Sequence, residues 1–432
     1  MKGRAMLRRT FGFLLGTLAL AGCGMPQSGP YGRVGQSQSL LPTGPSAGSS
    51  ATAPQFSPAA RNASRVAILL PLSGSMANVG QPMLQAAQLA LPPAGAPALS
   101  VKDTGGTAEG AVAAAQAAIA EGAGMILGPL TSAETAAVAP IATQAGVPVL
   151  AFTNAGSLAQ PGVWTLGITP AQQVRRMVAA AQAQGKTEFA ALLPESDFGR
   201  SMGDALLEAC ASAGLNTPTI RYHGSATGSI NSAAREVSGY GSRRGPIDAQ
   251  IKAARAEGTP EGRRRAADLA RSRIPPAPFN ALLLADVRDN LQLIAAVLPY
   301  YDIDPPGVQI MGPALWAASS SGSGAMQGAW FAAPDNAARA PLEELYSAKY
   351  GASPPPLADL AFDAASIARV LAGQGGYSIP ALTQQAGFAG ADGWMVLMPD
   401  GKVRRGLAVY RIERGGPAMV EPAPASAAIP GS

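Results

Sequence analysis

The chain has 432 residues, a formal net charge of +5, 47% hydrophobic residues and only 5% aromatic residues. Four of its cations lie within the first nine residues, and beyond them 28 Lys and Arg stand against 27 Asp and Glu. This length accommodates two or three domains, and the nearly balanced charge does not support nucleic-acid binding.

The N-terminus has the pattern of a bacterial lipoprotein signal. A basic stretch precedes an apolar segment, residues 11–20, that is too short to span a bilayer comfortably. The following Leu20-Ala21-Gly22-Cys23 resembles a lipobox, in which Cys23 is acylated and becomes the first residue of the mature protein. Gly24, not Asp, comes next, which by resemblance to Gram-negative sorting rules favours the outer membrane. The alternative is a plain signal peptide that happens to contain Cys.

A segment rich in Pro, Gly, Ser and Gln follows the signal. Its composition over residues 23–64 is typical of a disordered tether, which would let a folded domain reach away from its membrane. The second cysteine, Cys210, has no partner once Cys23 carries lipid, so no disulfide is expected. Cys210 lies in a helical run and is interpreted as a small buried hydrophobe.

Short apolar runs alternate with helical patterns from residue 65 to residue 184. This alternation has the spacing of βαβ units and predicts a parallel sheet. The expected strands are 66–70, 99–102, 125–127, 147–152 and 164–168. The expected helices are 79–91, a run within 105–121, 134–144 and 170–184.

Two of these strands end in loops of small residues, many with hydroxyl or amide side chains, residues 128–132 and 152–157. We expect Ser132 to cap the helix that follows the first loop, with Glu134 near the positive end of the helix dipole. Hydroxyls and free backbone N–H groups at a helix start form an anion site, here at the carboxyl edge of the sheet. The site would suit a carboxylate as well as a phosphate.

The pattern restarts at residue 189, where Phe-Ala-Ala-Leu-Leu-Pro repeats the design of Val-Ala-Ile-Leu-Leu-Pro at 66–71. A second unit of the same kind is therefore expected. Its strands would be 219–222, 280–286 and 308–311, and its helices 230–239 and 289–299. The chain then gives helical runs at 341–350 and 357–373, and strand-like segments at 394–398 and 407–413.

Residues 235–275 interrupt the second unit with ten Lys or Arg and five Asp or Glu. Pro246 and Pro260 stand where first-turn prolines stand, so two short helices joined at Gly258-Thr259 are expected. The segment is either a solvated charged insertion or a docking surface for an acidic partner or lipid headgroups.

Signals of catalysis are weak throughout. His223 is the single histidine, and the sequence has no P-loop, no Gly-x-Gly-x-x-Gly and no zincin motif. The one Gly-x-Ser-x-Gly match, at 44–48, lies in the tether without the strand and helix that its chemistry needs. Asp359 and Asp363, four residues apart on a helix, are interpreted as solvated or capping acids. We therefore expect no cofactor, no metal and no enzymatic activity.

Seven stretches in order resemble the type I periplasmic-binding-protein superfamily, and within it the leucine-binding-protein-like lipoproteins called penicillin-binding protein activators. They include VAILLPLSGSMANVGQPMLQAAQLAL, GVPVLAFTN, LLPESDFG, MGPALW and LAFDAASIA, and the resemblance covers about residues 65–413. It implies an α/β fold of two doubly wound parallel-sheet lobes, joined by a three-crossover hinge and closing on a ligand.

The resemblance also implies a division of the chain. The signal peptide would be 1–22, lobe 1 would be 65–170 plus 334–388, and lobe 2 would be 171–333 plus 389–414 with the insertion 235–275. Residues 415–432 are expected to be a disordered tail.

In amino-acid-binding relatives, two loops of lobe 1 hold the ligand carboxylate. The resemblance transfers these roles to Ser132 and Thr153, and makes the Ala151 carbonyl a partner for the ligand ammonium. Ser73 and Thr131 belong to the same set of expected cleft residues. The alternative is that these hydroxyls only cap helices.

The second lobe departs from the relatives. Phe198 replaces a tyrosine, and Ala314 stands where an acid would hold the ammonium. Asp286 could substitute for that acid, because an unpaired ammonium in a closed cleft costs several kcal/mol. Trp316 lines the cleft or merely fills the wall between the lobes.

Two functions follow from the resemblance. The first is a non-enzymatic periplasmic lipoprotein that contacts a penicillin-binding protein, a peptidoglycan synthase, through a surface that includes Arg263, Arg264 and Arg265. The second is a substrate-binding receptor that delivers an amino acid or related small molecule to an ABC permease. A purely structural envelope protein is a third option.

Overall fold

The first sheet is built on β1 (Arg65–Leu70), an apolar strand in which five of the six residues are buried. The computed structural model describes residues 63–92, 95–319 and 326–424. Within them the sheet has the order β2-β1-β3-β4-β5, and every pair in it is parallel, as the alternation of strands and helices predicts. The other strands are β2 (Ala98–Asp103), β3 (Ile126–Leu127), β4 (Val149–Ala151) and β5 (Val163–Thr165).

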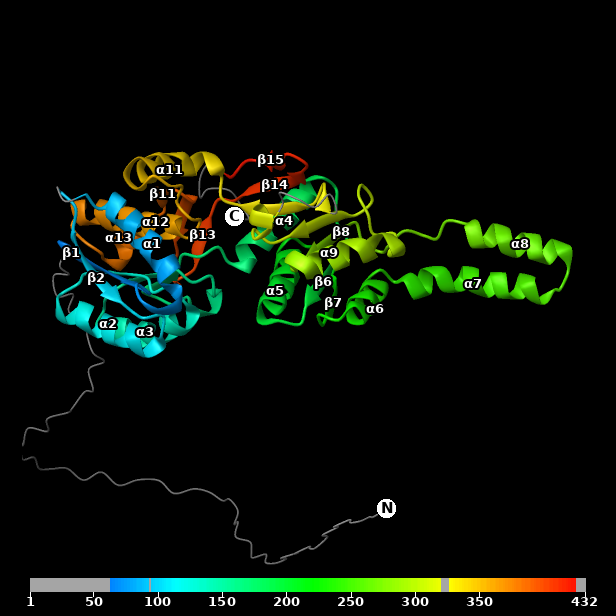
Figure 1. Cartoon of the computed structure of the whole chain (residues 1–432), viewed down its shortest axis with the longest axis horizontal. Helices are drawn as coiled ribbons and strands as arrows, with labels where there is room; N and C mark the ends of the chain where they lie inside the picture. Colours follow the sequence, from blue (N-terminus) through cyan, green and yellow to red (C-terminus); the bar gives the residue numbers. More distant parts are fainter. Residues whose placement is uncertain (1–62, 93–94, 320–325, 425–432) are drawn as a thin grey trace, which may run out of the picture. The chain divides into compact units, whose positions relative to one another are not determined.

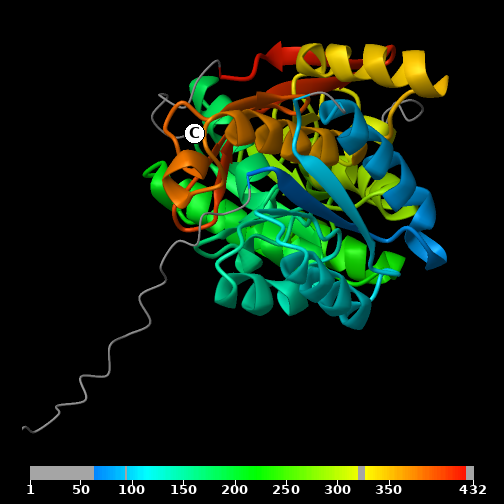
Figure 2. The ribbon, with the colours of Figure 1, turned by 90° about the vertical axis from the view of Figure 1, so that its left-hand side faces the viewer.

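Helices cover both faces of this sheet, as Figure 2 shows. Successive side chains of a strand point to opposite faces. Ile68 of β1 accordingly packs in one apolar core with α1 and α12, and its neighbour Leu69 packs in another with α2 and α3. The bounds are α1 (Ala77–Ala90), α12 (Ala358–Gly373), α2 (Ala108–Ala120) and α3 (Ser132–Gln144). We call the sheet and its helices the first lobe.

The second sheet has the order β15-β14-β10-β9-β8-β6-β7. The pairs from β7 to β10 are parallel, whereas β14 and β15 are added antiparallel at one edge. The strand that repeats the design of β1 is β6 (Phe189–Pro194), so the restart in the sequence marks a second sheet. The others are β7 (Thr219–His223), β8 (Ala281–Leu284), β9 (Gln309–Gly312), β10 (Trp330–Ala333), β14 (Ala408–Glu413) and β15 (Gly416–Glu421).

Two pairs of helices cover the second sheet in the same manner. Leu192 packs with α6 and α9, whereas Leu193 packs with α4 and α5. The bounds are α4 (Pro170–Ala183), α5 (Asp197–Ser212), α6 (Thr227–Val237), α9 (Arg288–Val297) and the short α10 (Trp316–Ser319). This sheet and its helices form the second lobe.

The chain passes between the two sheets three times. It crosses after β5, after β10 into α11 (Asn336–Tyr350), and again between β13 and β14. Two doubly wound α/β units joined by three crossovers are the expected fold class, and the structure confirms it.

A small sheet, β11-β12-β13, precedes the last crossover. Its strands are β11 (Phe388–Gly390), β12 (Gly393–Leu397) and β13 (Val403–Arg405), and the short α13 (Ile379–Leu382) precedes them. Met395 and Leu397 pack in the same apolar core as β1, and the Trp164 indole N–H donates to the Met398 carbonyl at 2.7 Å. These contacts favour a lobe boundary after Arg405 instead of the expected one after residue 388, and we propose that boundary.

The C-terminal segment differs from its expected description. Residues 416–421, assigned to a disordered tail on their Pro and Ala content, form β15 and pair with β14. Gly416 has a φ of +116°, a backbone conformation that suits the tight turn between the two strands. Glu421, the last residue of β15, forms an ion pair with Arg176 of α4 at 2.9 Å. This ion pair connects the strand to the helix.

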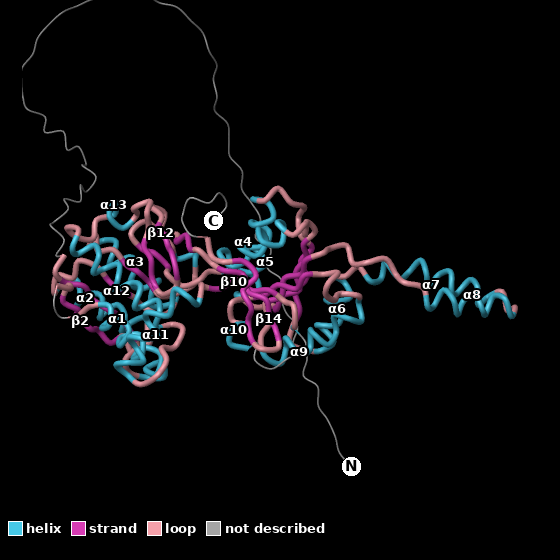
Figure 3. Tube along the Cα trace, turned by 90° about the horizontal axis from the view of Figure 1, so that it is seen from above, coloured by secondary structure: helices cyan, strands magenta, loops and turns pink. Residues whose placement is uncertain are grey.

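The interrupting segment is a helical hairpin of α7 (Tyr240–Ala256) and α8 (Pro260–Arg271). Figures 1 and 3 show the two helices running side by side away from the second sheet. Pro260 starts α8 as expected, with the Thr259 hydroxyl accepting from the Gly262 N–H. Pro246, expected at a helix start, lies inside α7 instead, because the helix begins six residues earlier.

Candidate functional site

Three expected site loops follow neighbouring strands of the first sheet. Ser73 lies beyond β1, Thr131 and Ser132 lie beyond β3, and Thr153 lies beyond β4. Since these parallel strands are adjacent in the order β1-β3-β4, their carboxyl ends meet at one edge of the sheet. Gly128 makes the approach possible, because a Cβ there would lie 2.4 Å from the Leu69 carbonyl oxygen.

Thr131, not Ser132, caps α3. Its backbone is extended, its hydroxyl accepts from the Glu134 N–H at 3.2 Å, and the Glu134 carboxylate accepts from the Thr131 N–H at 2.8 Å. This reciprocal pair is a capping box. Ser132 is the first helical residue and is exposed. Its expected capping role is therefore wrong, although its hydroxyl stays at the edge of the sheet.

Glu134 is fully buried and also serves a second strand. The Thr104 hydroxyl, just beyond β2, donates to Glu134 Oε1 at 2.5 Å. One carboxylate thus holds the loops after β2 and β3 together. Sequence reasoning placed Glu134 only as a favourable charge at a helix start.

Ser73 belongs to a loop organised by Asp103. The Asp103 carboxylate accepts from the backbone N–H groups of Leu72, Ser73 and Gly105 at 2.8–3.3 Å. The Ser73 hydroxyl hydrogen bond, together with these N–H groups, holds the pKa of Asp103 below its usual value. The Ser73 hydroxyl is therefore already used within the chain.

The expected ligand groups beyond β4 also have partners. The Thr153 hydroxyl accepts from the Ala155 N–H at 3.1 Å, which closes a local turn, and Thr153 is buried. The Ala151 carbonyl, expected to meet a ligand ammonium, accepts from the Leu166 N–H at 2.7 Å in the sheet. The Thr153 hydroxyl and the Ala151 carbonyl thus stabilise the backbone between β4 and the first crossover.

The second lobe brings together Asp286 and the single histidine. His223 ends β7 and Asp286 follows β8, on either side of β6, and both side chains are buried. His223 Nε2 lies 3.1 Å from Asp286 Oδ2, and its Nδ1 lies 2.9 Å from the Gly224 carbonyl oxygen. Both ring nitrogens therefore face acceptors, an arrangement that the doubly protonated imidazolium satisfies. Sequence reasoning treated the two residues separately.

The pKa of His223 reflects this environment. Burial alone lowers it, but the hydrogen bonds to Asp286 and the Gly224 carbonyl, with the nearby carboxylate charges, raise it above its ordinary value. The raised pKa favours the protonated imidazole of His223 beside Asp286.

Trp316 is part of the second-lobe core. Its ring is fully buried, and its indole N–H donates to the Asp286 backbone carbonyl at 2.8 Å. The ring lies so close to Gly312 that a Cβ there would approach it to 2.3 Å. Phe198, on the first turn of α5, packs partly buried against the neighbouring core. Both side chains thus pack against apolar neighbours in the second lobe.

A second buried charge cluster lies beside the crossovers. Asp359 and Asp363 of α12, interpreted from sequence as solvated or capping acids, are buried at 3% and 2% exposure. Arg339 donates to Asp359 at 2.6 Å, and the backbone N–H groups of residues 391 and 392 donate to Asp363. Arg405 lies 3.1 Å from Asp392 and donates to the Leu166 carbonyl, so it joins the small sheet to the first crossover.

Burial raises the pKa of several carboxyls in this cluster. For Asp359 it raises the pKa to about 6. Asp363 and Asp392 are both raised by burial, and for Asp363 the neighbouring Asp392 adds to the rise. The carboxyls of Asp359, Asp363 and Asp392 lie near only two guanidinium groups, those of Arg339 and Arg405. The cluster therefore binds a proton more readily than exposed acids do.

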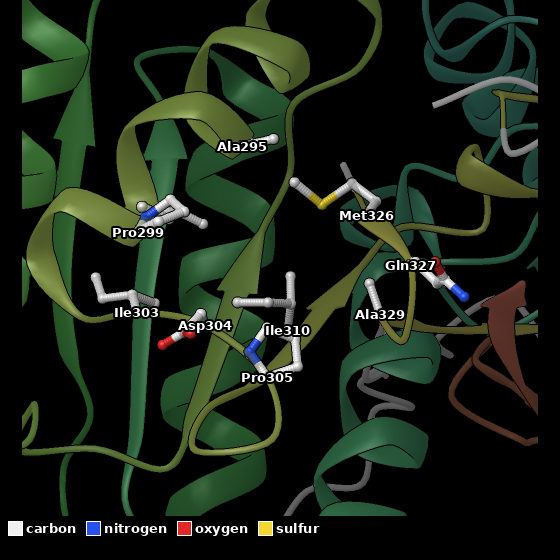
Figure 4. A pocket seen from close by; sticks show the side chains of 10 residues that line it. Ala295, Pro299, Ile303, Asp304, Pro305, Ile310, Met326, Gln327 and Ala329 are labelled. Atoms are coloured by element: carbon white, nitrogen blue, oxygen red, sulfur yellow. The ribbon is translucent and has the colours of Figure 1, made fainter. Parts of the chain in front are cut away.

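A cavity of about 60 Å³ lies elsewhere in the second lobe, beside α9 and β9 (Figure 4). Ligand pockets for small molecules usually exceed about 300 Å³. Its lining residues, which include Leu298, Ile310 and Met326, contain no expected site residue.

The remaining predictions concern chemistry outside these edges. Cys23 lies outside the described residues, so its acylation stays a prediction. Cys210 is buried, and burial raises the pKa of its thiol to about 11, as suits a packed hydrophobe.

In the described part of the chain, no cluster of His, Cys, Asp or Glu has the makings of a metal site. None of the helices described there has the length and apolarity that crossing a bilayer requires.

Comparison with known proteins agrees with this architecture. By sequence, no curated protein matches. Among solved structures, the chain is similar to a branched-chain amino acid ABC transporter periplasmic ligand-binding protein from Burkholderia xenovorans, with 15% identity over 82% of this chain and 94% of that one, at a TM-score of 0.61. It is also similar to LpoA from Haemophilus influenzae, with 18% identity over 84% of this chain and 59% of that one, at a TM-score of 0.59.

A third similar structure is the leucine-binding protein LivK from Thermotoga maritima, with 18% identity over 82% of this chain and 97% of that one, at a TM-score of 0.51. At these identities the likeness concerns the fold alone. The sequence profile described as periplasmic binding protein matches residues 64–417, which is most of the chain. The chain therefore belongs to the periplasmic binding protein family.

Proposed function

We propose that this chain is a non-enzymatic periplasmic lipoprotein that modulates peptidoglycan synthesis by contacting a penicillin-binding protein. The observation that carries the proposal is the pairing of Asp286 with His223 at 3.1 Å. In this chain Asp286 is the acid that could replace the one missing at Ala314. A ligand ammonium would have to share that buried carboxylate with the His223 ring.

Such sharing is unfavourable. Both members of the pair are almost fully buried, so an ammonium there would compete with the His223 ring for one carboxylate. On the carboxylate side, the hydroxyl oxygens of Thr153 and Thr131 accept from the N–H groups of Ala155 and Glu134, so these two backbone donors are not free for a ligand carboxylate. The chain supplies its own partners to the groups that relatives offer to a ligand.

The resemblance to penicillin-binding protein activators supports the same role. It rests on stretches of both lobes in the expected order, and LpoA is among the similar structures. An acylated Cys23 followed by a long tether would place the two lobes away from a membrane, within reach of a synthase. Gly24 after that cysteine favours the outer membrane as the site of the anchor, by resemblance to Gram-negative sorting rules.

A synthase assay tests the proposal. The mature chain without its lipid-bearing Cys23, residues 24–432, is added to a bifunctional penicillin-binding protein from the same genome, and glycan polymerisation and crosslinking are followed. We expect stimulation, and we expect Thr153→Ala to stimulate equally because the expected cleft is not used. A synthase whose rates do not change in the presence of the chain would contradict the proposal.

The second candidate is a receptor that delivers a small amino-acid-like solute to an ABC permease. Ser132 favours it, since this hydroxyl is exposed at the start of α3, where free N–H groups also point. Two similar structures are named as proteins of amino-acid transport or binding. This candidate requires a solute that binds without displacing His223.

A further inference from the structure

The helical hairpin α7–α8 is firmly anchored at its base. Arg243 has a side chain only 8% exposed, and it donates to the carbonyl oxygens of Ser238, Pro275 and Tyr301 at 2.6–2.9 Å. Its guanidinium also lies over the Tyr240 ring, and Tyr240 meets Tyr301 edge to face. These directed contacts attach the base of the hairpin to the second lobe.

The hairpin beyond this base has one small apolar seam. Ile251, Ala254 and Ala266 are buried there, with Ile247 and Leu269 packed against them. The remaining faces are exposed and carry charge. Among the described residues, six exposed cations of the hairpin and its exit make no ion pair: Lys252, Arg255, Arg263, Arg264, Arg271 and Arg273.

Arg265 differs from its two neighbours. It forms a two-pronged contact with Glu257 at 2.9 and 3.2 Å, and this ion pair joins the C-terminal end of α7 to the middle of α8. Of the three arginines expected to contact a partner, Arg263 and Arg264 therefore remain available, whereas Arg265 stabilises the hairpin turn.

An exposed apolar stripe begins next to the anchor. Leu293 and Tyr300 are 37% and 79% exposed, and with Ala296 they follow each other at helical spacing along α9 and the 3-10 turn Leu298–Tyr301. The backbone carbonyl of Tyr301, the next residue, accepts a hydrogen bond from Arg243. An exposed tyrosine in an apolar stripe, on a lobe that also carries exposed arginines without ion pairs, has the composition of a protein-binding hot spot.

We propose that the hairpin α7–α8 and the stripe of Leu293, Ala296 and Tyr300 form one docking surface for an acidic face of the partner protein. The inference rests on the proposed function, since it takes the partner to be the penicillin-binding protein. Charge complementarity identifies the partner face, because nine cations and four acids lie between residues 240 and 273. The tyrosine stripe supplies the apolar contact at the base.

A protein fits this surface better than a membrane does. Helices that bind lipid surfaces combine cations with bulky Trp, Phe or Leu on the inserted face. The exposed apolar residues of α7 and α8 are Ala, and acids such as Glu261 and Asp268 stand between the cations. Mixed charges on an anchored hairpin suit a protein surface that carries a complementary pattern of charges. Such charges can also distinguish that surface from those of other proteins.

Binding measurements on charge-reversed variants test the inference. The mature chain is captured on a biosensor, and the periplasmic region of the penicillin-binding protein is the probe. We expect Arg263→Glu/Arg264→Glu to weaken binding about tenfold, mainly through a slower association rate. Arg369→Glu/Arg414→Glu is the matched control, with the same charge change at exposed arginines that make no ion pair in the described part of the chain. It should change the dissociation constant less than about twofold.

Tyr300→Ala separates the apolar contact from the charges. We expect it to weaken binding about tenfold through faster dissociation, as loss of a buried aromatic anchor does. Unchanged circular dichroism and melting temperature show that each variant is folded.

The outcomes separate this inference from the proposed function. If the wild-type chain does not bind the synthase, both the proposed function and the docking surface are wrong. If it binds and the hairpin variants bind equally well, only the docking surface is wrong. Vesicles of phosphatidylethanolamine and phosphatidylglycerol serve as a second probe. Loss of vesicle binding in Arg263→Glu/Arg264→Glu, with synthase binding unchanged, would overturn the inference in favour of a membrane contact.

Discussion

Charged side chains serve opposite purposes at the sheet edges and on the helical hairpin. At the edges, Asp286, Glu134 and Asp103 each have partners within the chain, and the first two are buried. On the hairpin, Arg263 and Arg264 are exposed and make no ion pair among the described residues. Several polar groups at the expected ligand edges thus have partners within the chain, whereas the insertion carries several exposed cations that make no ion pair among the described residues.

This contrast indicates how one fold can change its task. A cleft that binds solutes must leave polar groups unpaired until the ligand arrives, and such groups cost stability. Here the groups hold loops in place instead, so binding capacity is expected at another surface. The contrast also separates the mutational effects, because paired buried charges affect folding and free exposed charges affect association.

The largest effect is expected at Arg405, whose side chain is fully buried beside Asp392. Arg405→Met leaves a buried carboxylate without its cation and should lower the free energy of unfolding by about 3–5 kcal/mol at pH 8. Urea denaturation measures it. The loss should shrink at pH 5, where protonation neutralises the neighbouring carboxyls.

The adjacent Arg404 provides the control. It is exposed, so Arg404→Met should cost less than about 0.5 kcal/mol. If the two variants are equally stable, the buried cluster does not hold the small sheet to the crossover in the way described.

The next effect is expected at the second-lobe edge. His223→Gln removes the cation of Asp286 and leaves at most one hydrogen bond, at a cost of about 2 kcal/mol. The double variant His223→Gln/Asp286→Asn removes the charge as well and should regain part of the loss. A double variant no more stable than the single one would show that the carboxylate has another partner.

The histidine pair has a defined pH dependence. Because the folded pKa of His223 is raised, its stabilising contribution is fully present below the unfolded pKa and is lost as pH rises through the folded pKa. The stability difference between wild type and His223→Gln should therefore narrow toward alkaline pH.

Asp359 gives an effect of the same sign. Burial raises its pKa from 3.8 to about 6, so the folded state keeps a proton that the unfolded state has released. Stability should fall as pH rises from 4 to 6, with at most about 1.4 kcal/mol per pH unit from this group. Asp359→Asn should flatten the profile, and an unchanged slope would contradict the assignment.

The smallest effect on folding is expected for the hairpin. Arg263→Glu/Arg264→Glu should change the free energy of unfolding by less than about 0.5 kcal/mol, because exposed charges without partners contribute little. Thermal denaturation at two salt concentrations checks this. A loss comparable to that of His223→Gln would mean that these arginines stabilise the fold and are not free for a partner.

Much of the fold could be predicted from the sequence. The apolar run of β1 and its repetition at β6 indicate two similar parallel sheets, and both are present. β15 could not be predicted, because its Pro and Ala residues have little strand propensity and the antiparallel pairing with β14 decides its structure. Thr131 and Ser132 were indistinguishable as caps, since both are hydroxyl residues and only backbone geometry selects one.

The charged groups of the candidate site were harder to predict. Residue spacing shows that Asp359 and Asp363 share a helix face, but it does not say which face meets the core. The Ala-rich, nearly apolar sequence of α12 was the available signal, because a helix that is apolar on all sides is usually buried. For His223, the signal was its place at the end of a strand whose neighbour two positions along the sheet ends near Asp286.

Calorimetry with a panel of amino acids and small amides tests the central claim most directly, using the mature chain. The internally paired edges predict no binding heat at micromolar concentrations for any member of the panel. Micromolar binding that is lost in Thr153→Ala and restored in Thr153→Ser would show that the sheet edges receive a ligand, and would contradict the account.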